Sequence, residues 1–121
     1  MPDRRLVVKI TCGPEALERL NQGVTVATLA LAAGAQVSVW LSGEATWFAV
    51  PGRAEGWVLP RAAALADLRD ILLAENAVTV CSQCAARRGL DTVDLPPGAR
   101  IAGSASFVEE ILEDGTQALV Y

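Results

Sequence analysis

The apolar segments of this chain alternate between two periods, and this alternation constrains the fold more than any other feature. Short runs rich in β-branched residues, typical of buried strands, occupy 6–12, 36–41, 77–81, 100–102 and 117–121. Helical patterns fill 15–33, 62–75, 82–88 and 106–113, and 44–50 suits one or two helical turns. Strands that alternate with helices predict an α/β fold with three layers, α/β/α, around a mainly parallel five-stranded sheet.

The length of 121 residues suits a single domain spanning 1–121. We expect the flavodoxin-like strand order 2-1-3-4-5, which is common in sheets of this kind. Cys12 closes the first strand and Cys81 closes the third. In that order the two strands are neighbours, so both thiols are expected at the carboxyl edge of the sheet, where ligands collect.

A stretch without charge runs from Leu20 to Gly43. It is long enough to cross a membrane, but polar residues are scattered through it, and Gly34 separates a helical pattern from an alternating one. We therefore interpret it as a helix followed by a strand and expect no membrane insertion. A helix without charge on any face is buried on more than one side, which predicts a homo-oligomer.

Composition excludes several classes of function. The formal net charge is −4, and nucleic-acid binding requires a concentrated basic surface instead. The chain has no histidine, so the commonest general base and many metal sites are missing. Three cysteines cannot all pair within one chain, and no secretory signal pattern opens the sequence. We expect free thiols, a cytoplasmic protein and no cofactor.

The segment VTVCSQCAARRG, residues 78–89, carries the main candidate site. Cys81 lies where a strand ends and a helix begins, so unpaired backbone N–H groups and the helix dipole would favour its thiolate. Ser82 is the expected N-cap, which puts Cys84 in the first turn as a candidate resolving thiol. The opposing interpretation is that Cys81 only ends a buried strand, because free cysteine is often buried.

The C-x-x-C spacing leaves other chemistry open. A thioredoxin-like redox pair is one interpretation, although that motif normally follows the first core strand. A structural zinc site needs four ligands, and the chain has three cysteines and no histidine. We expect no metal site.

Four further residues complete the predicted binding set. Cys12 and Gly13 lie at the first strand's end, where the turn GPE could hold an anion at a helix start. Glu44 follows the second strand and is the nearest candidate proton acceptor, and Arg87 would add positive potential. The tryptophans, at 40, 47 and 57, are expected to line a pocket beside the cysteines or to fill a subunit interface.

Nearly the whole chain resembles the DsrE/DsrF-like sulfur-relay proteins. The resemblance rests on TCGPE, ERLNQG, GAQVSVWLSGEAT, AVTVCSQCAARRGL and IAGSASFVEEILEDG, and the block VC-x-x-C-x-x-RRG is its most specific part. It implies a three-layer domain that assembles as trimers or hexamers. It also implies that the cysteine at position 81 accepts a persulfide, and it associates the C-x-x-C arrangement with less characterised members.

Three hypotheses follow. In the first, Cys81 takes sulfane sulfur as a persulfide and passes it from a donor protein to an acceptor, as a sulfur carrier or sulfurtransferase. In the second, the chain is a non-catalytic oligomeric module that binds a small anion or a partner protein. In the third, Cys81 forms a reversible disulfide with Cys84 or Cys12 in a thiol redox protein.

Overall fold

The computed structural model describes residues 4–121 and shows a five-stranded, fully parallel sheet in the order β4-β3-β2-β1-β5. The strands are β1 (Arg5–Ile10), β2 (Gln36–Leu41), β3 (Val78–Cys81), β4 (Ala99–Ala102) and β5 (Thr116–Val120). The helices are α1 (Leu17–Ala32), α2 (Leu65–Ala74), α3 (Ser82–Arg87) and α4 (Ser104–Ile111). Short 3-10 segments occupy η1 (Pro14–Ala16), η2 (Gly43–Ala49), η3 (Ala54–Gly56) and η4 (Thr92–Asp94).

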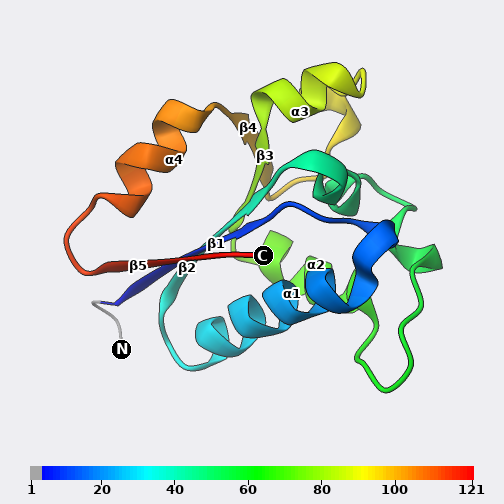
Figure 1. The fold of residues 1–121 in the computed structure, drawn as a ribbon, viewed down its shortest axis with the longest axis horizontal. Coiled ribbons are helices and arrows are strands. Elements are labelled where there is room, and N and C mark those ends of the chain that lie inside the picture. Colours follow the sequence, from blue (N-terminus) through cyan, green and yellow to red (C-terminus); the bar gives the residue numbers. More distant parts are fainter. Residues whose placement is uncertain (1–3) are drawn as a thin grey trace.

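The three-layer α/β/α class is therefore confirmed, but the predicted strand order is wrong. The chain steps from β1 through β2 and β3 to β4 in one direction, and then returns to place β5 beside β1. Right-handed crossovers put α1, α2 and α3 on one side of such a sheet and α4 on the other; Figure 1 shows α4 across the sheet from α1 and α2. In the order 2-1-3-4-5, β2 would be an edge strand. Instead, β2 pairs with β1 along one edge and with β3 along the other.

The two faces of the sheet differ in chemistry. The apolar face consists of alternate strand residues that pack under α1 and α2: Leu6, Val8, Ile10, Val37, Val39, Leu41, Val78, Val80 and Ile101. Leu20 and Val24 of α1 and Leu72 of α2 complete this core and are fully buried. The polar face consists of the intervening residues, next to α4: Arg5, Val7, Lys9, Ser38, Trp40, Thr79, Cys81 and Arg100. Burial of aliphatic side chains on the first face is the main source of stability.

A buried carboxylate holds α4 on the polar face. Glu110 of α4 is 7% exposed and accepts hydrogen bonds from four side chains. The donors are Arg5 (3.3 Å), Ser38 (2.6 Å), Trp40 (3.2 Å) and Arg100 (2.7 Å). An ionised carboxylate in a buried position is tolerated only when its acceptor sites are filled in this way.

Several helix starts differ from the sequence prediction. Residues 14–16 form a 3-10 turn before α1, and residues 62–64 lie outside α2. The helix α4 begins at Ser104 with Gly103 as its N-cap, two residues before the predicted start at residue 106. Gly34 has a φ of 94° and ends α1 as predicted.

The charge-free part of α1, from Leu20 onward, is buried on one side within the single chain. Leu20, Gly23, Val24 and Ala27 are buried, whereas Leu29 is 64% exposed. Within residues 4–121, no helix is long and apolar enough to cross a membrane.

Candidate functional site

Cys81 occupies the junction between β3 and α3. It is the last residue of the strand and also the N-cap of the helix, with a φ of −60° and a ψ of 127°. The predicted N-cap, Ser82, is instead the first helical residue. The shift by one position matters because the N-cap side chain is the one that faces the free N–H groups of the first turn.

The surroundings of Cys81 favour its thiolate. Burial acts against this by raising the pKa of the partly exposed Cys81 thiol. The backbone N–H and the thiol of Cys84, the backbone N–H of Gln83 and the charge of Lys9 outweigh it, so the pKa is lowered from its ordinary value. Since the thiolate is the nucleophile, the lowered pKa favours Cys81 over Cys12, whose pKa is raised, as the reactive thiol.

Cys84 lies next to Cys81 but is buried. Its Sγ accepts a hydrogen bond from the backbone N–H of Gly43 at 3.2 Å. Gly43 has a φ of 54°, and a Cβ there would lie 2.7 Å from the carbonyl oxygen of Thr11. Only glycine suits this position, where the loops after β1 and β2 meet.

Cys12 is separated from this pair. Strand β2 lies between β1 and β3, so Cys12 and Cys81 end strands that are not neighbours. Cys12 is 3% exposed, and burial, followed by the charge of Glu15, raises the pKa of its thiol. All three cysteines are free thiols in the structure. The adjacent pair is therefore Cys81 and Cys84.

The remaining predicted residues have partners of their own. The N–H of Gly13 donates to the Glu15 carboxylate at 2.7 Å, so an intramolecular carboxylate already occupies this anion-binding position. The Glu44 carboxylate accepts from Arg88 at 2.8 and 3.1 Å and from the indole of Trp47 at 3.3 Å. Arg87 is exposed.

Two side chains in this region were not among the predicted site residues. Arg88 joins α3 to η2, because it pairs with Glu44 and also donates to the carbonyl oxygen of Cys84 at 3.1 Å. Lys9 affects the pKa of Cys81 from β1, two strands away. The only available signal for Lys9 was its position as a single charge inside the apolar run LVVKITC.

The tryptophans do not form one cleft. Trp40 packs edge-on against Phe107 beneath α4, with ring centroids 5.4 Å apart. Trp57 stacks on Phe48 and lines a hollow of about 250 Å³, while Arg53 lies 4.2 Å from the centre of the Trp47 ring.

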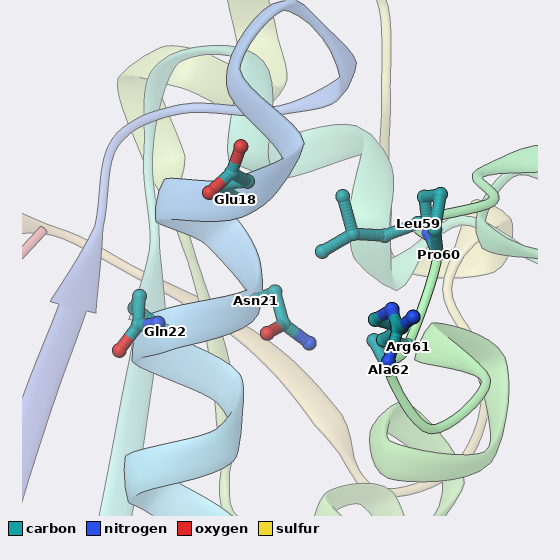
Figure 2. A pocket seen from close by; sticks show the side chains of 7 residues that line it. All are labelled: Glu18, Asn21, Gln22, Leu59, Pro60, Arg61 and Ala62. Atoms are coloured by element: carbon teal, nitrogen blue, oxygen red, sulfur yellow. The ribbon is translucent and has the colours of Figure 1, made fainter.

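A larger hollow of about 380 Å³ lies between α1 and the loop 59–62. Figure 2 shows Asn21 and Leu59 facing each other across it. No cysteine lines either hollow. In the described part of the chain, no group of three or more cysteine or acidic residues is arranged to hold a metal.

Comparison with known proteins agrees with this architecture. The model of the DsrE/DsrF-like family matches residues 4–121, so the chain belongs to that family. No curated protein matches the sequence.

Two solved structures share the fold. One is the YchN protein from E. coli, with 20% identity, a TM-score of 0.79 and coverage of 98% of this chain and 99% of that one. The other is MTH1491 from Methanobacterium thermoautotrophicum, described as a protein of unknown function, with 13% identity, a TM-score of 0.65 and coverage of 98% and 99%.

Proposed function

We propose that the protein carries sulfane sulfur as a persulfide on Cys81 and passes it to a partner protein. Family membership supports a function of the sulfur-relay kind. The observation that carries the proposal is the position of Cys81. Cys81 is the N-cap residue of α3, and its partly exposed thiol has a lowered pKa. A thiolate at the carboxyl edge of a parallel sheet is placed where a donor can reach it.

The transfer is a pair of displacements at sulfur. The Cys81 thiolate attacks the outer sulfur of a donor persulfide, R–S–SH; a new S–S bond forms on Cys81, and the donor leaves as R–S⁻. A thiolate of the acceptor then attacks the outer sulfur on Cys81, which restores the Cys81 thiolate. Both steps conserve charge and need no external oxidant.

Cys84 provides an alternative exit for the sulfur. Its thiolate would attack the inner sulfur of the Cys81 persulfide, forming the Cys81–Cys84 disulfide and releasing HS⁻. The hydrogen bond from Gly43 to the Cys84 Sγ would stabilise the attacking anion. A reductant would then be needed to restore both thiols.

Intact mass spectrometry tests the proposal. After incubation with a small-molecule persulfide donor, the protein should gain about 32 Da, the mass of one sulfur atom. Cys12→Ala should load as the original chain does, and Cys84→Ala should load but release no sulfide. An adduct that persists in Cys81→Ser, or the absence of any adduct, would contradict the proposal.

Self-association is part of this proposal. Leu29 on the charge-free helix is 64% exposed, and the other exposed apolar residues include Leu112 and Val120, 74% and 66% exposed. These side chains could be covered by a second copy of the chain, and the family resemblance favours a trimer or hexamer. Sedimentation velocity would show a single species larger than a monomer, whereas a monomer at every concentration would contradict self-association.

A further inference from the structure

Lys9 carries a charge that no carboxylate of the described residues neutralises. The side chain is half-buried on the polar face, and its Nζ lies 4.9 Å from the centre of the Phe107 ring. Arg5 and Arg100, on the same face, are both paired with Glu110. Among residues 4–121, no carboxylate lies within ion-pair distance of the Lys9 ammonium group.

Glu110 is the buried carboxylate on this face, and its acceptor sites are already used. One oxygen accepts from Arg5 and Ser38, and the other accepts from Trp40 and Arg100. Because a carboxylate offers about four lone-pair positions, the network is saturated. The Lys9 charge therefore remains available to another anion on this face.

The register of the strands places Cys81 on the same face as Lys9. Lys9 pairs with Trp40, and Trp40 pairs with Thr79. Cys81 lies two residues beyond Thr79 on β3, so its side chain points to the same side of the sheet. The aromatic ring of Phe107 holds the lysine side chain in place through a cation–π contact.

We propose that Lys9 is a positioning residue whose ammonium group stabilises the anionic sulfur on Cys81, in both the thiolate and the persulfide. The effect of Lys9 on the persulfide rests on the proposed function, whereas its effect on the thiolate does not. The direction of the Cys81 pKa agrees with the geometry, since Lys9 is one of the groups that lower it.

Most other charged groups on the polar face, and on α3 and η2, are already paired. On α3 and η2, Arg88 is bound to Glu44, and Arg87 is exposed. On β1, β4 and α4, the groups are Arg5, Arg100, Glu110 and Glu113, which pair with one another. The adjacent titratable group is the Cys84 thiol.

The pH dependence of alkylation at Cys81 tests the proposal. The rate would be followed with iodoacetamide by mass spectrometry of the peptide that contains Cys81. Lys9→Met keeps an unbranched apolar side chain over Phe107 and removes only the charge, so it should raise the midpoint of the profile by about half a unit to one unit. Lys9→Arg should restore the original midpoint, because it restores the charge.

Arg19→Met is the matched control, because Arg19 is an exposed cation at the start of α1. Its removal should move the midpoint by less than about 0.2 unit, since solvent and salt screen the charge. Two outcomes would overturn the proposal. One is an unchanged midpoint in Lys9→Met. The other is a shift of equal size in Lys9→Arg, which would indicate that packing rather than charge is responsible.

A second measurement separates this inference from the proposed function. With a persulfide donor, at a pH below the midpoint, Lys9→Met should load sulfur about three- to tenfold more slowly, in line with its smaller thiolate fraction. If the original chain loads no sulfur, the proposed function fails, and the alkylation profile still decides the role of Lys9. If the original chain and Lys9→Met load equally fast, Lys9 has no part in sulfur transfer.

Discussion

The two faces of the sheet differ in role: the apolar face stabilises the fold, and the polar face carries the candidate site. The apolar face is a continuous layer of aliphatic side chains under α1 and α2, whereas the polar face has one covering helix, held by a single saturated carboxylate. Each fully buried aliphatic side chain on the first face contributes about 1.5–3 kcal/mol. The second face contributes less stability, but it carries Cys81 and Lys9, whose charge lowers the pKa of the Cys81 thiol. We therefore expect substitutions on the apolar face to change the stability of the fold without changing the reactivity of Cys81.

The largest effect should follow from damage to the apolar face. Leu20→Ala removes a fully buried side chain of α1 and leaves a cavity, so it should lower the free energy of unfolding by about 3 kcal/mol. Urea denaturation would measure the loss. Where the variant remains folded, the pH profile of Cys81 alkylation should be unchanged. A shifted profile would break the proposed separation of the two faces.

A smaller effect should follow from damage to the polar face. Glu110→Gln keeps the shape of the side chain but removes the charge that pairs with Arg5 and Arg100. The side chains of these arginines are 27% and 55% exposed. Because solvent screens their charges, the free energy of unfolding should fall by only about 1–2 kcal/mol. The same urea measurement applies. A loss greater than that of Leu20→Ala would reverse the comparison.

One ion pair beside α2 makes the structure sensitive to acid. Hydrogen bonds from the buried Arg69, at 2.9 and 3.0 Å, lower the pKa of Glu55 to about 2. A carboxyl group with a lowered pKa stabilises the fold above its unfolded pKa of 4.5, and this contribution is lost as the pH falls from 4.5 toward 2. Urea midpoints over this range should fall less steeply in Glu55→Gln. An identical slope would exclude Glu55 as a source of acid sensitivity.

The smallest effect should be seen at Cys84. The backbone and thiol of Cys84 both help to lower the pKa of Cys81. Because Cys84→Ala removes only the thiol, the midpoint of Cys81 alkylation should rise by about half a unit to one unit, no less than in Lys9→Met. Cys12→Ala is the control and should leave the midpoint unchanged, since Cys12 ends a different, non-adjacent strand. A larger shift in Cys12→Ala than in Cys84→Ala would contradict the described arrangement.

The sequence by itself determined the class of fold and the position of the candidate nucleophile. Both depend on local patterns: β-branched runs alternate with helical ones, and a C-x-x-C begins where β3 ends. Gly34 and the strand 36–41 were predictable for the same reason, since a turn glycine and an alternating apolar run act over a few residues.

Only the tertiary structure decided the strand order, the partners of Glu44 and the approach of Lys9 to the Cys81 side of the sheet. Strand order depends on which strands pair with a neighbour along both edges. The Glu44 carboxylate, predicted as a proton acceptor, is paired with Arg88. Lys9 and Cys81 are 72 positions apart in the sequence, and parallel pairing through β2 places them on one face. Local periodicity carries no information about such distant pairings, because they arise only when the sheet assembles.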